Sequence, residues 1–186
     1  SVSAFLLNRS SDLEIEEARN QFKEFKGKDS VVIPNMIDEE EIRILSKEKV
    51  DIPKKKHNFL VVSRIDKQKG FERLEPVLQE CEKRYGKDYQ FVIVGSCNLF
   101  DGYVQDIKNR LSNYNVIWEG MQENPYKYMN WADSLWQLSD YESQCMVMYE
   151  SLIVGTPCVC TDFPTAIKSL KFGKGYVVKK DLSNLD

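Results

Sequence analysis

The stretch FLVVSRIDKQKG, residues 59–70, joins a short apolar run to a polar loop. Its first four residues are apolar without interruption, which is typical of a strand buried on both faces of a parallel sheet. Apolar side chains then recur at helical spacing, at Leu74, Val77, Leu78 and Cys81. This spacing predicts a helix that ends near Gly86. A strand, a loop and a helix therefore follow one another from residue 59.

The same alternation continues through residue 178. Short apolar runs predict further strands at 90–95, 115–118, 134–138, 157–160 and 175–178. Helical spacing predicts helices at 104–111 and 145–154. Strands that alternate with helices form right-handed βαβ units, so we expect an α/β fold with a Rossmann-like, doubly wound parallel sheet. Ligands bind such sheets where the loops leave the carboxyl ends of the strands.

The N-terminal part of the sequence has a different character. We expect a polar amphipathic helix at 12–25 and a strand at 31–33. The segment that follows, as far as Lys56, is rich in charged residues. This part does not continue the regular alternation that begins near residue 58.

The composition excludes several classes of protein. The 186 residues are 42% hydrophobic and 30% charged, as in an ordinary globular domain. The formal net charge of -3 repels nucleic acid, so we expect no nucleic-acid partner, and a local cluster of cations around any anionic ligand. Five cysteines and one histidine lack the paired spacing of a zinc site, so we expect no four-ligand zinc site. No apolar run approaches the roughly 18 residues of a membrane span.

Two cations follow the first strand of the alternating region. Arg64 lies at the end of the strand, and Lys69 precedes Gly70 at the start of a helix. Together they could clamp a diphosphate, with arginine as a fork and lysine as a point charge. The spacing fits a solvated basic loop equally well. Gly95, which ends the second strand, allows a close approach to its backbone or is a plain turn.

Two glutamates lie in the stretch SDYESQCMVMYE, residues 139–150. Glu142 falls in a loop after a strand, and Glu150 falls about one turn into the following helix. The free N–H groups at the helix start, from Gln144 to Met146, favour an anion, and the carboxylate of Glu150 could accept hydrogen bonds from ribose hydroxyls. Favourable charge at a helix N-terminus is the alternative interpretation of both glutamates.

Eight sequence blocks, in this order, carry a resemblance to a known family. They are VIPNMID (32–38), VVSRIDKQKGF (61–71), VIVG (92–95), VIWEG (116–120), NPY (124–126), AD (132–133), Glu142-x7-Glu150 and GTP (155–157). The order and spacing resemble those of the retaining glycosyltransferases of the two-domain GT-B fold, specifically glycosyltransferase family 4. The resemblance implies that this chain is the C-terminal half of a GT-B fold. Residues 1–50 would be the end of the N-terminal domain or the crossover, and residues 51–186 would be the nucleotide-sugar-binding domain.

The resemblance also implies roles for individual residues. Arg64 and Lys69 would bind the donor diphosphate and act catalytically by neutralising the leaving nucleotide. Glu150 would bind the ribose, and Glu142 would lie beside the transferred sugar as a third catalytic residue. The remaining donor-binding positions would be Ser63, Gly95, Trp118, Gly120, Met121, Ser143, Gln144, Cys145 and Met146.

The implied activity is that of a retaining hexosyltransferase. It would transfer a sugar from a nucleotide-diphosphate sugar to a glycan or lipid-linked acceptor, in polysaccharide or cell-envelope biosynthesis, without a metal. The acceptor would bind mainly to a missing N-terminal domain, so we expect no turnover by this chain alone. We expect a cytoplasmic protein with peripheral contact to the inner face of the membrane.

The sequence departs from the family pattern at two places. Ser63 stands where the family usually has glycine, and Ser143-Gln144-Cys145 replaces Gly-Phe-Gly or Gly-Phe-Pro. These departures leave open a non-catalytic GT-B-like partner or a nucleotide-binding module. A dinucleotide oxidoreductase is excluded, because the loop after residue 62 lacks the G-x-G-x-x-G pattern.

Overall fold

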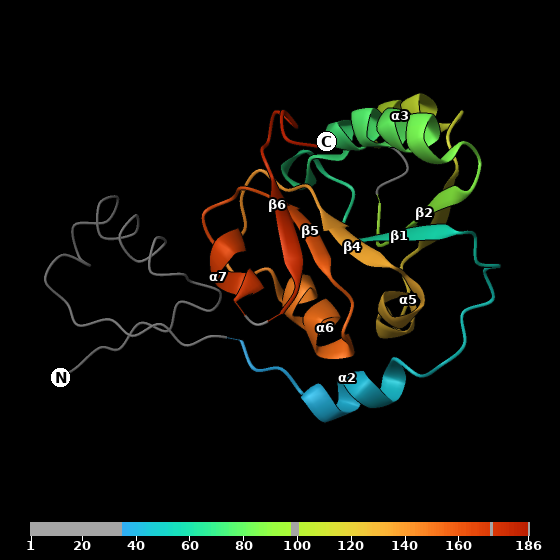
Figure 1. Cartoon of the computed structure of the whole chain (residues 1–186). Coiled ribbons are helices and arrows are strands. Elements are labelled where there is room, and N and C mark those ends of the chain that lie inside the picture. The colour runs from blue at the N-terminus through green and yellow to red at the C-terminus, as the bar shows by residue number, and fades with distance from the viewer. Residues whose placement is uncertain (1–34, 98–100, 172, 186) are drawn as a thin grey trace, which may run out of the picture.

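The computed structural model describes residues 35–97, 101–171 and 173–185. Its centre is one six-stranded parallel sheet with the strand order β3-β2-β1-β4-β5-β6 (Figure 1). The strands are β1 (His57–Val62), β2 (Tyr89–Val94), β3 (Val116–Gly120), β4 (Ser134–Gln137), β5 (Cys158–Thr161) and β6 (Gly175–Val178). The six strands predicted between residues 59 and 178 are confirmed, with ends that differ by at most two residues. The helix expected at 12–25 and the strand expected at 31–33 lie outside the described residues.

Helices cover both faces of this sheet. The helices α3 (Leu74–Tyr85) and α4 (Gly102–Leu111) cover one face, and α5 (Tyr126–Trp131), α6 (Met146–Val154) and α7 (Ala166–Leu170) cover the other (Figure 1). The helix α2 (Glu39–Leu45) packs against α5 and α6. Two short 3-10 helices, η2 (Lys67–Lys69) and η3 (Phe71–Arg73), precede α3. The expected doubly wound, Rossmann-like α/β fold is confirmed.

Three short helices were not expected from the sequence. The helices α2, α5 and α7 contain 7, 6 and 5 residues, too few for a repeated apolar spacing. Local capping explains α2, because the side chain of Asp38 accepts a hydrogen bond from the Glu41 N–H at 2.9 Å. Ile42 is the one residue of α2 that is buried, so α2 has no repeated spacing of buried apolar residues from which a helix could be predicted.

Two apolar cores result, one on each face of the sheet. Leu74, Val77 and Leu78 of α3 pack against β1 and β2 on the first face. Met148 of α6 packs with Leu60 and neighbouring side chains on the second face. Every residue of β2 is buried, because helices lie on both sides of this strand. The uninterrupted apolar runs of the sequence are therefore explained by burial from both sides.

We predict that Leu78→Ala lowers the free energy of unfolding by about 2–5 kcal/mol, because Leu78 is 0% exposed and its removal leaves a cavity. Urea unfolding followed by circular dichroism measures the change. Gln79→Ala is the matched control, since Gln79 is the next residue of the same helix and is exposed. It should change the free energy by no more than about 0.5 kcal/mol. Equal effects of both substitutions would contradict the packing described for α3.

Candidate functional site

A cavity of about 520 Å³ lies at the carboxyl ends of β1 and β4. The strand order reverses between these two strands, because the chain leaves β1 toward α3 on one face and leaves β4 toward α6 on the other. Such a reversal leaves a crevice between the departing loops. The cavity is lined by Asn35, Val62, Ser63, Arg64, Gln68, Lys69, Gln137, Tyr141, Glu142, Ser143, Gln144, Cys145, Met146 and Val147.

The loop after β1 supplies two cations of different character. The side chain of Arg64 is 70% exposed and lies 3.3 Å from the carboxylate of Asp66. Lys69 ends the 3-10 helix η2, and its side chain is only 15% exposed. Arg64 is thus a solvated cation at the rim, whereas Lys69 is a largely buried cation in the cavity wall.

The loop after β4 places the carboxylate of Glu142 against Lys69. The Nζ atom of Lys69 lies 2.6 Å from Oε1 of Glu142, whose side chain is 11% exposed. The same oxygen accepts hydrogen bonds from Nε2 of Gln137 at 2.9 Å and from Oγ of Ser139 at 2.7 Å. One carboxylate oxygen therefore receives three donors, which fixes the side chain of Glu142 in place.

Side chains from neighbouring elements hold the backbone of this loop. Oγ1 of Thr165 donates to the carbonyl of Glu142 at 2.8 Å, and Oγ1 of Thr161 donates to the carbonyl of Ser139. Nε2 of Gln68 donates to the carbonyl of Tyr141 at 3.0 Å. The loop after β4 is therefore tied to the loop after β1 on one side and to β5 and the start of α7 on the other.

The start of α6 forms another wall of the cavity. Cys145, the residue that caps this helix, makes no side-chain hydrogen bond to the first turn. The positive end of the helix dipole therefore faces the cavity without a competing side-chain cap. Gln144 is engaged elsewhere, because its Oε1 accepts a hydrogen bond from the N–H of Asn35 at 2.8 Å.

Two buried polar atoms of residues that line the cavity have no hydrogen-bond partner among the described residues. They are Oγ of Ser63 and Oε1 of Gln137. Buried polar atoms are normally paired, so a ligand that supplies hydrogen-bonding groups would complete this wall.

Two glycines hold the loops around the cavity close together. Gly95 has a φ of 152°, and an added Cβ atom would lie 1.9 Å from the carbonyl oxygen of Ser63. Gly70 has a φ of 64°, and a Cβ atom there would lie 2.1 Å from the carbonyl oxygen of Leu138. Of the two interpretations that the sequence allowed for Gly95, the structure shows a close approach to its backbone, made by the neighbouring loop.

The predicted site residues fall into two groups. Ser63, Arg64, Lys69 and the four residues that follow Glu142 line the cavity together with Glu142 itself. Five others do not line it: Gly95, Trp118, Gly120, Met121 and Glu150. The sequence analysis did not single out Gln137, although a polar residue between the apolar Trp136 and Leu138 is a signal that could have indicated it.

The second group lies on neighbouring elements. Glu150 is half-buried on α6, and burial raises the pKa of its carboxyl. The carboxylate of Glu150 also contributes to the raised pKa of Tyr126, so the two side chains are near one another. At the end of β3, Gly120 accepts a hydrogen bond from the N–H of Gly95 at 2.7 Å. Trp118 packs against the core below α3 and α4, with the ammonium of Lys108 5.3 Å from its ring centroid.

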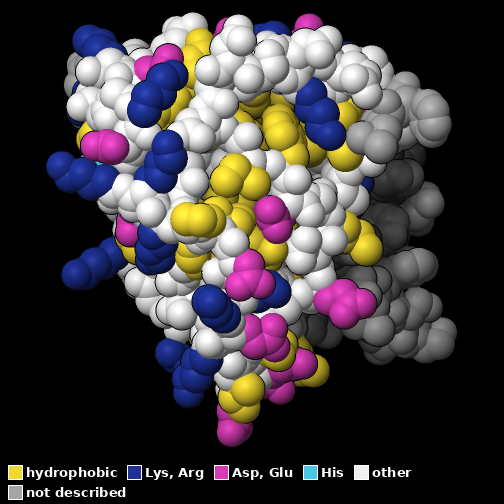
Figure 2. Space-filling model, turned by 90° about the vertical axis from the view of Figure 1, so that its right-hand side faces the viewer, with side chains coloured by type: hydrophobic (Ala, Val, Ile, Leu, Met, Phe, Trp, Pro, Cys, Tyr) yellow, Lys and Arg dark blue, Asp and Glu magenta, His cyan; other side chains and the backbone are white. Residues whose placement is uncertain are grey.

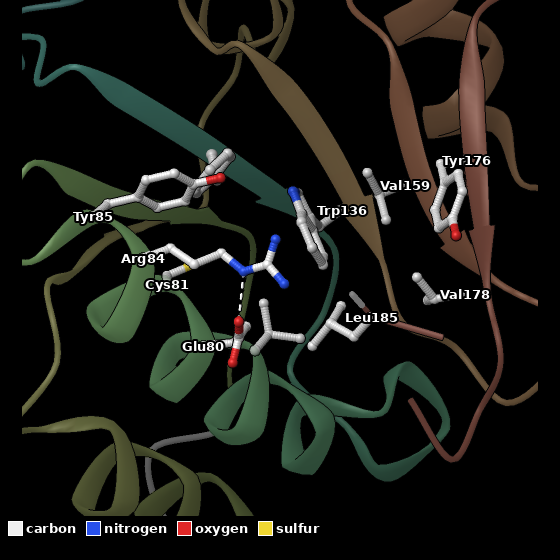
Figure 3. A pocket seen from close by; sticks show the side chains of 11 residues that line it. Glu80, Cys81, Arg84, Tyr85, Trp136, Val159, Tyr176, Val178 and Leu185 are labelled. Carbon is white, nitrogen blue, oxygen red and sulfur yellow. Dashed lines mark hydrogen bonds and ion pairs between the residues drawn. The ribbon is translucent and has the colours of Figure 1, made fainter. Parts of the chain in front are cut away.

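A second cavity, of about 330 Å³, has a different character (Figure 3). It lies between α3 and the open face of β4, β5 and β6, and most of its lining is apolar. Trp136, Val159 and Tyr176 project into it from the strands (Figure 3). Its two charged residues, Glu80 and Arg84, pair with one another across one turn of α3. This lining does not suit a diphosphate.

The surface adds little to the choice of site. On the face shown in Figure 2, basic, acidic and hydrophobic side chains all occur, and acidic ones gather at the lower end, where α2 lies in Figure 1.

Within residues 35–97, 101–171 and 173–185, no helix is long and apolar enough to cross a membrane. The same residues contain no group of three or more histidine, cysteine, aspartate or glutamate side chains that could hold a metal ion.

We predict that Gly95→Ala destabilises the fold by about 1–3 kcal/mol through backbone strain, because the new Cβ atom would collide with the carbonyl of Ser63. Gly102→Ala is the control, since no heavy atom lies within 4 Å of an added Cβ atom at that helix position. There alanine should be neutral or stabilising by about 1 kcal/mol. Thermal unfolding of both variants tests the pair. A Gly95→Ala variant as stable as the wild type would show that the two loops are not held in contact.

Comparisons with known proteins bear on the family and the fold of this chain. The family model for glycosyl transferases group 1 matches residues 42–184. The N-acetylgalactosamine-N,N'-diacetylbacillosaminyl-diphospho-undecaprenol 4-alpha-N-acetylgalactosaminyltransferase of Campylobacter jejuni is 32% identical over 156 residues, which are 82% of this chain and 41% of that protein. The chain spans about two fifths of the length of the first curated relatives that it matches, 41% and 38%.

Solved structures show the same fold. Anabaena HepE in complex with UDP and glucose superimposes with a TM-score of 0.68 at 18% identity, over 91% of this chain and 50% of that one. A TarM variant of S. aureus, in complex with Fondaparinux, alpha-GlcNAc-glycerol and UDP, superimposes with a TM-score of 0.69 at 20% identity, over 95% of this chain and 34% of that one. At these identities the likeness concerns the fold.

Proposed function

Because the chain belongs to the group 1 glycosyl transferases, with the family model matching residues 42–184, we propose that it is the donor-binding half of a retaining, family 4 hexosyltransferase. The fold is that of one Rossmann-like half of a GT-B glycosyltransferase. The donor in this proposal is a nucleotide-diphosphate sugar. In this proposal residues 51–186 are the binding domain, and residues 1–50 are the end of the N-terminal domain or the crossover segment.

The observation that carries the proposal is the charge distribution of the cavity at the ends of β1 and β4. Lys69 lies in its wall, Arg64 at its rim, and the positive end of α6 faces it. A diphosphate suits such an arrangement, because each phosphate meets a cation or helix N–H groups. The apolar cavity beside α3 offers no comparable set of cations.

Glu150 supports a ribose subsite next to this cavity. Its carboxylate is half-buried, and no described residue donates a hydrogen bond to it. Two ribose hydroxyls would supply the missing donors. The nucleobase then lies toward the end of β3, around Trp118, Gly120 and Met121. The hydrogen bond between Gly95 and Gly120 supports this direction, because it joins the ends of β2 and β3 at the same edge of the sheet.

The same geometry supports a charge-stabilised reaction. As the bond between the sugar and the diphosphate breaks, negative charge grows on the leaving phosphate, and Arg64, Lys69 and the helix start stabilise it. We propose that these groups suffice without a metal. Glu142 lies beside the sugar, where a carboxylate stabilises an oxocarbenium-like state. Front-face attack by the acceptor then retains the anomeric configuration, and a double displacement with Glu142 as the nucleophile is the alternative.

The proposed acceptor is a glycan or a lipid-linked sugar in cell-envelope or polysaccharide biosynthesis. The Campylobacter jejuni relative supports it, because its name specifies a diphospho-undecaprenol acceptor. The acceptor would bind mainly to the other half of the enzyme, so this chain alone should bind nucleotide without turnover. The proposed location is cytoplasmic, with peripheral contact to the inner face of the membrane.

A non-catalytic GT-B-like partner, or a nucleotide-binding module, is the second candidate. It is favoured by Ser143-Gln144-Cys145, which replaces the expected glycine-rich loop. In addition, the side-chain oxygen of Gln144 is occupied by the N–H of Asn35. Hydrolysis or transfer of a donor by the longer protein, lost in Glu150→Ala, would exclude this candidate.

We predict that one of UDP, GDP and ADP binds to this chain, and that Lys69→Met weakens its binding at least about tenfold, since a hydrogen bond to a charged group contributes about 1.5–3 kcal/mol. Arg64→Met should also weaken binding, and it should leave stability unchanged because Arg64 is exposed. Isothermal titration calorimetry measures all of these affinities.

Lys67→Met is the matched control for this experiment. Lys67 belongs to the same 3-10 helix as Lys69, but it is exposed and does not line the cavity. Its replacement should change the affinity less than about twofold, as expected for a solvated surface charge. Binding of none of the three nucleotides, or equal losses in Lys67→Met and Lys69→Met, would contradict the proposed site.

A further inference from the structure

The cation proposed to hold the diphosphate is already paired in the unliganded cavity. Nζ of Lys69 lies 2.6 Å from Oε1 of Glu142, and the two side chains are only 15% and 11% exposed. An incoming phosphate must therefore share Lys69 with a carboxylate or replace it.

The carboxylate cannot easily withdraw to make room. Its Oε1 atom is held by Gln137 and Ser139 as well as by Lys69. The backbone of Glu142 is held by Thr165. Lys69 is flexible by comparison, since its ammonium is carried on four methylene groups. A ligand therefore meets a fixed negative charge and a cation that can turn toward it.

The neighbouring side chains Cys145 and Tyr141 add no charge beside this ion pair. Burial raises the pKa of the Cys145 thiol well above its usual range, so this neighbour stays neutral. Tyr141 is exposed. Lys69 and Glu142 cancel one another formally within the lining. The other positive groups there are the positive end of α6 and the exposed Arg64, whose ion-pair partner, Asp66, does not line the cavity.

The two ligands of a glycosyltransferase differ in charge at this position. In a nucleotide-sugar both phosphates are esterified, and each carries one negative charge. In the released nucleoside diphosphate the terminal phosphate carries no ester group, and a second pKa of about 6 gives it roughly one further negative charge at pH 7.5. A carboxylate fixed beside that phosphate repels the released product more than the substrate.

We propose that Glu142 is a specificity-determining residue that makes the site favour the esterified diphosphate of the donor over the free nucleoside diphosphate. This inference rests on the proposed donor site and assigns Glu142 a second task there. Its carboxylate stabilises positive charge on the sugar during transfer, and afterwards it speeds departure of the more highly charged product.

The test compares two ligands that differ only in esterification, UDP and its β-methyl ester, by isothermal titration calorimetry at pH 7.5. If GDP or ADP is the nucleotide that binds, the same pair is made from that nucleotide. The methyl ester carries the charge of a donor without its sugar, so the unknown sugar does not enter the comparison. Glu142→Gln removes the charge and keeps an oxygen that can accept the same hydrogen bonds.

We expect Glu142→Gln to tighten the binding of UDP about tenfold, equivalent to about 1.4 kcal/mol, and that of the methyl ester less than about threefold. The ratio of the two affinities is the decisive quantity, because a merely structural change would alter both affinities alike. The double variant Lys69→Gln with Glu142→Gln removes both buried charges together. Compared with Lys69→Gln alone, it should shift the ratio in the same direction as Glu142→Gln, even if the single Glu142→Gln variant does not fold.

Asp140→Asn is the control for a general loss of negative charge. Asp140 lies in the same loop, pairs with Arg73 and does not line the cavity. It should leave the ratio unchanged. A ratio unaltered in every variant without Glu142 would overturn this inference and leave the donor site standing. Failure of UDP, GDP and ADP to bind to the wild-type chain would overturn the donor site and this inference together.

Discussion

The rest of the site depends on the divergence of the chain after β1 and β4. These neighbouring parallel strands send their following helices to opposite faces of the sheet, so no backbone fills the space beyond their carboxyl ends. The cavity, the cations and the start of α6 all lie in that space. Any sequence that folds into this strand order has a crevice there, and the side chains of two loops decide what enters it.

The ion pair between Lys69 and Glu142 gives this crevice its chemical character. Two charges that leave water lose several kcal/mol of hydration each, and their attraction offsets that loss only with good geometry and further hydrogen bonds. Gln137 and Ser139 supply those hydrogen bonds. Such a pair contributes little to stability, but it keeps a cation and an anion at defined positions before a ligand arrives. Preorganised charge of this kind is what group transfer requires.

Much of the fold could be predicted because burial on both faces leaves an uninterrupted apolar run for each strand. The helices α3, α4 and α6 could be predicted from the spacing of their apolar residues, whereas α2, α5 and α7 are too short to show such a spacing.

In the site, the positions of Arg64, Lys69 and Glu142 in loops that follow strands could be predicted from the order of the elements along the chain. The role of Gln137 could not be predicted, because its contact with Glu142 depends on side-chain directions that no periodicity reports. The assignment of Glu150 stays a prediction, since it lies outside the lining of the cavity.

The close approaches at Gly70 and Gly95 separate the shape of the cavity from the chemistry of its lining. At both points backbone meets backbone, so these two close approaches do not depend on the side chains of residues 143–146. Residues 143–146 can then be exchanged while the frame around them stays the same. Such an arrangement favours the evolution of new specificities. Point substitutions in the lining can change the preference for the transferred group while the backbone fold of the site is kept.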